Sequence, residues 1–119
     1  TISDSIVVMH RNHIAVISAS SVTLPNEASA YDFTNSQSQA HGSGQIMASL
    51  TGGGFGLWCG DTDASGVIDG ADRNNTWNNR NLSTYIGSDT DLSGVVDGAD
   101  RNNTWNNRNV STQVPNFPN

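Results

Sequence analysis

Two short apolar runs near the start of the chain predict a β-hairpin. Residues 6–10 and 14–18 are rich in β-branched side chains, and Arg11-Asn12-His13 lies between them as a turn. Apolar and polar residues do not alternate in either run, which is typical of strands that are covered on both faces. We therefore expect both faces of this hairpin to be buried.

The chain between this hairpin and residue 58 carries weaker signals. Leu24-Pro25-Asn26 interrupts the strand pattern. The polar stretch after residues 31–34 predicts one or two helical turns. The three glycines in residues 51–54 predict a loop, and residues 55–58 predict a last strand before the pattern changes.

An internal repeat dominates the second half of the chain. Residues 61–81 and 89–109 are identical apart from the pairs Ala64/Leu92 and Ile68/Val96. Each copy ends in an asparagine-rich segment that is a weak helix former by itself. A metal-fixed loop before that segment would supply the nucleus that a short helix lacks. We therefore expect helices over 72–80 and 100–108.

Each copy begins with the ligand spacing of an EF-hand loop. Such a loop supplies oxygens from positions 1, 3, 5, 7, 9 and 12, and glycine at position 6 permits the positive φ that reverses the chain. In the first loop the predicted ligands are Asp61, Asp63, Ser65, the Val67 carbonyl, Asp69 and Asp72, with Gly66 at the turn. In the second loop they are Asp89, Asp91, Ser93, the Val95 carbonyl, Asp97 and Asp100, with Gly94 at the turn.

Hard oxygens in loose geometry suit calcium, so the sequence predicts two bound Ca²⁺ ions. Acidic turns also occur in solvated loops without a metal, but two complete copies in register favour the metal sites. Serine at position 5 and aspartate at position 12 predict weaker binding than in a cytosolic calcium buffer, or greater tolerance of Mg²⁺. We expect Ile68 and Val96, between ligands 7 and 9, to form a short β-bridge that joins the two sites.

Composition limits the other ways of stabilising this chain. Hydrophobic residues make up 34% of its 119 positions, and its single cysteine, Cys59, forms no intrachain disulfide. A metal or a partner chain is therefore expected to supplement the core. Eleven acidic residues, five arginines and no lysine give a net charge of −6, which disfavours nucleic acid and anionic membranes as partners. No apolar run reaches the roughly 18 residues that span a bilayer.

A metal loop followed by one helix, present twice without the leading helix of a true EF-hand, resembles a dockerin module over residues 60–110. The motif from Gly60 to Asn81 is similar to the dockerin-like C-terminal regions of large secreted bacterial surface proteins. The resemblance implies calcium-dependent folding, an extracellular location at the bacterial cell surface, and a role in attachment or assembly. Dockerins bind cohesins partly through the two residues before ligand 12. Here those residues are Gly70-Ala71 and Gly98-Ala99, which lack the hydroxyls typical of cohesin recognition.

These observations predict an α+β fold in two parts. Residues 1–58 form a β-rich region, completed by another chain or by sequence beyond the one given. Residues 59–119 form the dockerin-like module with its two loop–helix repeats.

The histidines and the cysteine of the chain do not form a recognisable catalytic arrangement. His10, His13 and His41 lack an accompanying carboxylate cluster, and Cys59 lacks a basic neighbour that would activate it. We therefore expect a non-enzyme. Trp77 and Trp105 are expected to pack across the internal twofold, with partner binding as the alternative. The helix arginines are expected to be solvated or paired with loop carboxylates; they are Arg73, Arg80, Arg101 and Arg108.

Two functions from different classes follow. The first is a structural subunit of a filament or surface layer, held rigid by calcium, whose hairpin is completed by strand addition from another copy as a homo-oligomer or polymer. The second is a docking domain for a separate cohesin-like receptor protein. Sequons at Asn74, Asn81, Asn102 and Asn109, and Asp4-Ser5-Ile6, are candidate glycosylation sites.

Overall fold

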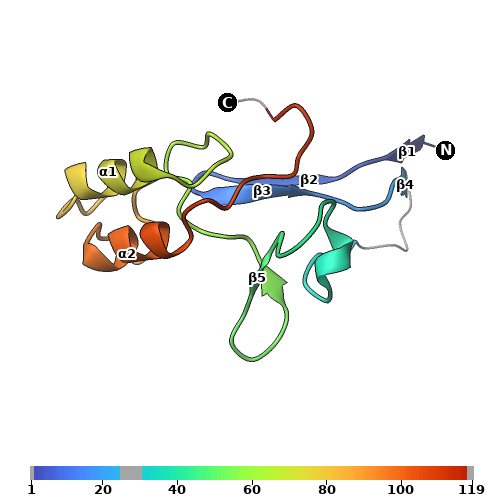
Figure 1. Cartoon of the computed structure of the whole chain (residues 1–119), viewed down its shortest axis with the longest axis horizontal. Coiled ribbons are helices and arrows are strands. Elements are labelled where there is room, and N and C mark those ends of the chain that lie inside the picture. The colour runs from blue at the N-terminus through green and yellow to red at the C-terminus, as the bar shows by residue number, and fades with distance from the viewer. Residues whose placement is uncertain (1, 25–30, 118–119) are drawn as a thin grey trace.

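The computed structural model describes residues 2–24 and 31–117 and has an α+β fold. In that part of the chain, six strands form three antiparallel pairs, and two α-helices follow them (Figure 1). The elements are β1 (Ile2–Asp4), β2 (Val7–His10), β3 (His13–Ile17), β4 (Val22–Leu24), the 3-10 helix η1 (Gln37–Gln39), β5 (Ala48–Ser49), β6 (Phe55–Gly56), α1 (Gly70–Asn78) and α2 (Gly98–Asn106). Of the predicted break at residues 24–26, Pro25 and Asn26 lie outside the described residues.

The predicted hairpin is confirmed, but its two strands differ in burial. β2 pairs with β3, with an irregularity between Val8 and His10. The centre of β3 is buried, whereas Val7, Val8 and Met9 of β2 are 42%, 36% and 58% exposed. The expectation that both strands are covered on both faces is therefore wrong for β2. Other segments of the chain bond to β3 and to the residue after it: Cys59 bridges to His13 at the start of β3, and Ala40 bridges to Ser18, just after its end.

The apolar core is small and lies over β3. Val16, Ala40, Ile46 and Met47 form its buried cluster, with Phe33, Phe55 and Leu57 packed against it. The side chain of Gln37, in the predicted helical turn, holds Met47 in place: its Nε2 donates to the Met47 carbonyl at 2.6 Å, and its Oε1 accepts from the Met47 N–H at 2.9 Å. The glycine loop at 51–54 is also confirmed, because Gly52, Gly53 and Gly54 all have positive φ.

Both helices begin two residues earlier than the sequence predicts. Asp69 is the N-cap of α1 and accepts from the Ala71 N–H, while Asp72 in the first turn accepts from the Asp69 N–H. Asp97 and Asp100 form the same capping box in α2. This reciprocal pairing satisfies N–H groups that the start of a helix leaves without partners, so the helix extends back to the cap.

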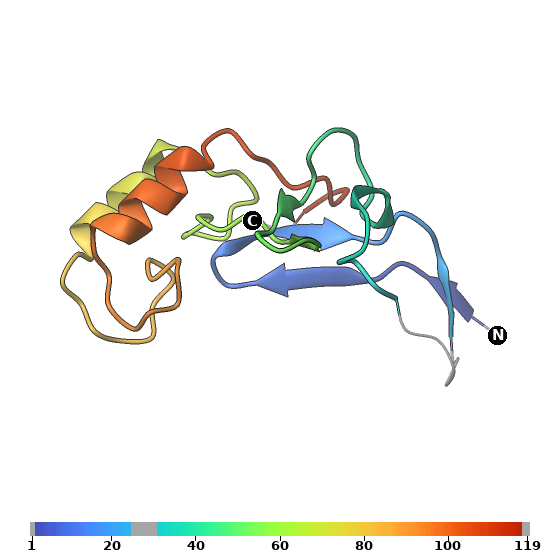
Figure 2. The ribbon, with the colours of Figure 1, turned by 90° about the horizontal axis from the view of Figure 1, so that it is seen from below.

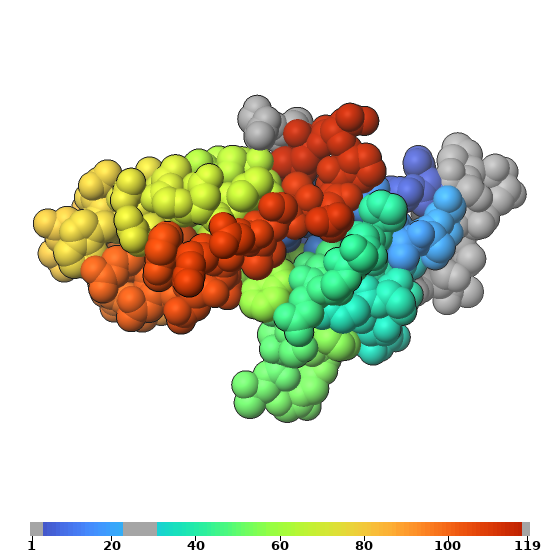
Figure 3. All heavy atoms as spheres, viewed as in Figure 1, coloured from blue at the N-terminus to red at the C-terminus, as the bar shows by residue number. Residues whose placement is uncertain are grey.

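The molecule is elongated, with extents of 49 × 32 × 27 Å. α1 and α2 lie side by side at one end, and the β1–β4 pair lies at the other (Figures 1 and 2). The chain after α2 returns along the hairpin (Figure 3), where the Thr112 hydroxyl donates to the Ala15 carbonyl at 2.7 Å. No helix in the described ranges has the length and apolar character needed to cross a membrane.

Candidate metal centres

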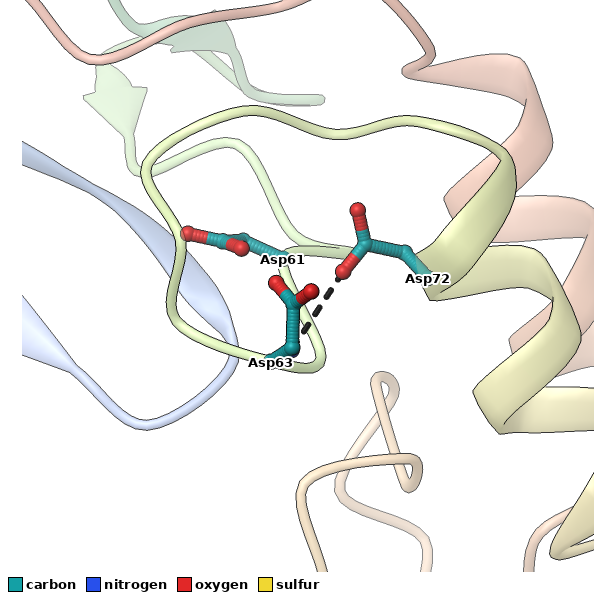
Figure 4. Close-up of side chains that lie close together, drawn as sticks. All are labelled: Asp61, Asp63 and Asp72. Atoms are coloured by element: carbon teal, nitrogen blue, oxygen red, sulfur yellow. Dashed lines mark hydrogen bonds between the residues drawn. The ribbon is translucent and has the colours of Figure 1, made fainter. Parts of the chain in front are cut away.

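Each repeat brings three carboxylates into one group. The first group is Asp61, Asp63 and Asp72, and the second is Asp89, Asp91 and Asp100. The carboxylate oxygens of a group lie within 4.8 Å of one another, so either group could hold a metal ion. Figure 4 shows how the first group forms: two side chains come from the loop, and the third comes from the first turn of α1.

Backbone reversal at two positions closes each loop. The predicted glycines, Gly66 and Gly94, have φ of 94° and 93°. Ala64 and Leu92, two residues earlier, also have positive φ, at 56° and 60°. That second reversal was not predicted, because alanine and leucine rarely adopt this conformation. Together the two reversals turn the backbone N–H groups of the loop inward.

These N–H groups hold the carboxylate at position 1. In the first loop, Asp61 accepts from the N–H groups of Ser65 and Gly66, both at 3.0 Å. In the second loop, Asp89 accepts from Ser93 at 3.1 Å and Gly94 at 2.8 Å. Because the donors are backbone groups, the carboxylate has a fixed position inside the loop.

The carboxylate at position 12 joins the end of each loop to its beginning. Asp72 Oδ1 accepts from the Thr62 N–H at 2.8 Å and the Asp63 N–H at 3.3 Å, and Oδ2 accepts from the Asp69 N–H at 2.8 Å. Asp100 accepts the equivalent bonds from Asp91 and Asp97. The helix cap and the candidate metal group therefore share one side chain.

Burial makes the negative charge of these groups unfavourable. Burial, together with the nearby Asp72 carboxylate, raises the pKa of Asp61 to about 6. Burial also raises the pKa of Asp72 and Asp100. Although burial opposes it, hydrogen bonds from Ser65 lower the pKa of the more exposed Asp63. A divalent cation would relieve the repulsion that favours protonation of the buried carboxyls.

The remaining predicted ligands lie outside the carboxylate groups. Asp69 and Asp97 cap the helices, each accepting from a backbone N–H at 2.9 Å. The hydroxyls of Ser65 and Ser93 donate to the carbonyls of Val67 and Val95, each at 3.2 Å. The structure thus gathers three of the six predicted ligands of each loop as carboxylates and places the other three in local hydrogen bonds.

The β-bridge expected between Ile68 and Val96 does not form. Ile68 instead exchanges hydrogen bonds with Asn109 and Val110, after α2, and Val96 exchanges them with Asn81 and Leu82, after α1. Both asparagines have φ of 73°, which turns the chain sharply after each helix and brings it back to the opposite loop. Each candidate metal loop is therefore hydrogen-bonded to the segment that follows the helix of the other repeat.

Asn12 in the hairpin turn connects to both loops, and sequence reasoning did not identify it. Its carbonyl accepts from the N–H groups of Gly60 and Asp61, at 2.9 and 3.1 Å. Its side-chain Nδ2 donates to the carbonyls of Gly87 and Asp89, at 3.0 and 2.8 Å. The residue is fully buried. Asparagine in a turn is ordinary in a sequence, so only the tertiary contacts reveal this role.

The hairpin also brings two histidines together. Nδ1 of His10 lies 3.0 Å from Nδ1 of His13. Burial, together with the charges of His10 and Arg11, lowers the pKa of His13 to about 4. Burial raises the pKa of the Cys59 thiol, which disfavours the reactive thiolate. The expectation of a non-enzyme stays a prediction.

Comparison with known proteins identifies no relative. No protein-family model, no curated protein and no solved structure matches the chain. The interpretation of the loops therefore depends on their own geometry.

Proposed function

We propose that this chain is a non-enzymatic, dockerin-like calcium-binding protein that works outside the cell as a structural or assembly module at the bacterial surface. The observation that carries the proposal is the pair of equivalent carboxylate groups. Their ligands are hard oxygens held by backbone N–H groups, which suits Ca²⁺ better than a transition metal. The full ligand set would add Ser65, the Val67 carbonyl and Asp69, and their repeat equivalents, after small side-chain adjustments.

Calorimetric titration of metal-free protein with Ca²⁺ should give two sites. Asp61→Ala should remove one site, because it deletes a buried ligand and the acceptor for two loop N–H groups. Asp89→Ala should remove the other. Asp32→Asn is the matched control, since Asp32 is an exposed aspartate outside both loops and bonds to Thr34. A wild-type stoichiometry of zero or one would refute the proposal.

The exposed strand β2 supports an assembly role. In the described part of the chain it pairs with β3 alone, so its other edge offers backbone groups for a further strand. Val7, Val8 and Met9 present apolar side chains there. Val8 also borders an apolar hollow of about 190 Å³, together with Phe33, Phe55 and Leu57. A strand from a second copy would bond to the β2 edge and cover this surface.

Val7→Asp should dissolve such assemblies and leave two-site calcium binding intact, because a buried charge at the strand contact is strongly unfavourable. Light scattering of concentrated protein in calcium would measure the change. Leu50→Asp is a control of the same kind, at a residue that is 50% exposed outside β2. A wild-type protein that stays monomeric at high concentration would contradict assembly. It would favour the docking function, in which the module binds a separate receptor protein.

A further inference from the structure

A polar groove lies between the two helices. It has a volume of about 400 Å³ and is lined by three equivalent residues from each repeat. They are Arg73, Asn74 and Trp77 from α1, and Arg101, Asn102 and Trp105 from α2. The groove therefore repeats the same side chains on its two walls, and neither proposed metal group contributes to it.

Arginines stack on the two tryptophans, a contact that the expectation of solvated or carboxylate-paired arginines did not include. Across the helix pair, the guanidinium of Arg73 lies 4.3 Å from the centre of the Trp105 ring, and that of Arg101 lies 4.6 Å from the Trp77 ring. The rings remain partly open, with Trp77 43% and Trp105 38% exposed. Stacking fixes the plane of a guanidinium and leaves its N–H groups at the edge, where they can bind an anion in bidentate fashion.

The other two helix arginines are held differently. Arg80 and Arg108 also stack on the tryptophan of their own helix, at 4.6 and 4.8 Å. Each donates from Nη1 to the carbonyl of that tryptophan, at 2.8 and 2.9 Å. They do not line the groove, so they supply an internal comparison for Arg73 and Arg101.

The charge distribution indicates an anionic ligand. Four of the five arginines of the chain, which has no lysine, lie on this helix pair or directly after it: Arg73 and Arg101 are in the helices, and Arg80 and Arg108 follow them by two residues. The amides of Asn74 and Asn102, which also line the groove, offer both donors and acceptors. Guanidinium groups suit acidic substituents, and carboxamides suit hydroxyls, so the lining matches a chain that carries both.

We propose that this groove binds an acidic polysaccharide, with Arg73 and Arg101 each pairing with an acidic group of the sugar chain. A peptide fits less well, because the groove offers neither a free strand edge nor an enclosed apolar pocket. Single-stranded nucleic acid fits less well too, because it stacks its bases on free aromatic faces, whereas here each ring carries guanidiniums. The proposal does not depend on the assembly function.

The test uses the full chain in calcium, titrated with short oligosaccharides that do not gel. One probe is an oligogalacturonate, one is a sulfated oligosaccharide, and one is a neutral dextran oligomer. We expect at least one acidic probe to bind, and the preferred one distinguishes carboxylate from sulfate recognition. Arg73→Gln/Arg101→Gln should weaken that binding by about tenfold or more, because two charge-assisted contacts are lost.

Arg80→Gln/Arg108→Gln is the matched control, since it removes the same charge from the same helices but not from the groove lining. It should weaken binding less than about threefold, as expected for a screened, longer-range effect. Asn74→Asp/Asn102→Asp keeps the arginines and tryptophans and adds negative charge inside the groove, so it should also weaken binding by about tenfold or more. Helical circular dichroism and calcium stoichiometry, measured on the same samples, separate loss of the groove from loss of the fold.

Three results would overturn the proposal. The first is wild-type protein that binds both acidic probes no more tightly than dextran. The second is an equal loss of affinity in the two arginine pairs, which would indicate a general charge effect. The third is tighter binding of a poly-glutamate peptide than of either acidic sugar, which would make the ligand a protein segment. None of these results bears on the two calcium sites, whose stoichiometry is measured separately.

Discussion

Chelation of divalent cations should unfold most of the chain between residues 60 and 110. The buried apolar side chains of this segment are few: in the described structure, Ile68 and Val96 are its only fully buried hydrophobic residues. The segment also buries four aspartates, whose charges repel one another without a cation. They are Asp61, Asp72, Asp89 and Asp100. The segment therefore has little to offset the entropy of ordering its backbone.

The expected effect is large for a protein of this size. At a free calcium concentration of about 100 times the dissociation constant, each site adds about 2.7 kcal/mol to the free energy of unfolding. Two sites would then supply a large share of the about 5–15 kcal/mol that stabilises an ordinary domain. Helical circular dichroism in excess EDTA measures this directly. The signal should fall on chelation and return when calcium is restored, and a signal unchanged by EDTA would contradict the calcium dependence.

Local features were predictable from the sequence. The three carboxylates of each group belong to one loop and its following helix, so their spacing alone brings them together. The hairpin and the glycine turns also follow from short-range patterns. The helix starts were misplaced by two residues, because Asp69 and Asp97 were interpreted only as ligands when they are also caps.

Contacts between distant segments were not predictable. Ile68 pairs with Val110, and Val96 pairs with Leu82. Both pairings require the segment after each helix to run back to the loop of the other repeat. β2 is exposed because the segments around Ala40 and Cys59 bridge to β3 and the residue after it rather than to β2. The stacking of Arg73 on Trp105 depends on how α1 packs against α2. In each case the residues lie too far apart in the sequence for periodicity or spacing to connect them.

Asn12→Ala should destabilise the whole protein, because Asn12 connects the hairpin to both loops. Removing Nδ2 leaves the carbonyls of Gly87 and Asp89 without this donor, in a place where Asn12 itself is fully buried. Each unsatisfied buried group costs about 1–3 kcal/mol, so the loss of two should lower the free energy of unfolding by about 2–6 kcal/mol. Urea denaturation in calcium measures this loss. Asn74→Ala, at an exposed asparagine, is the control and should change stability by less than about 1 kcal/mol.

The two proposed calcium sites should respond unequally to the same substitution. Asn12 reaches the first loop through its backbone carbonyl, which alanine retains, and the second loop through its side chain, which alanine lacks. Calcium affinity should therefore fall more at the Asp89 loop than at the Asp61 loop. Asn12→Asp should be worse than Asn12→Ala, because it places a carboxylate oxygen against the same two carbonyls. Titration calorimetry of Asn12→Ala in the Asp61→Ala and Asp89→Ala backgrounds isolates each loop. Equal losses at both loops would show that Asn12 acts only on overall stability and does not position the second site.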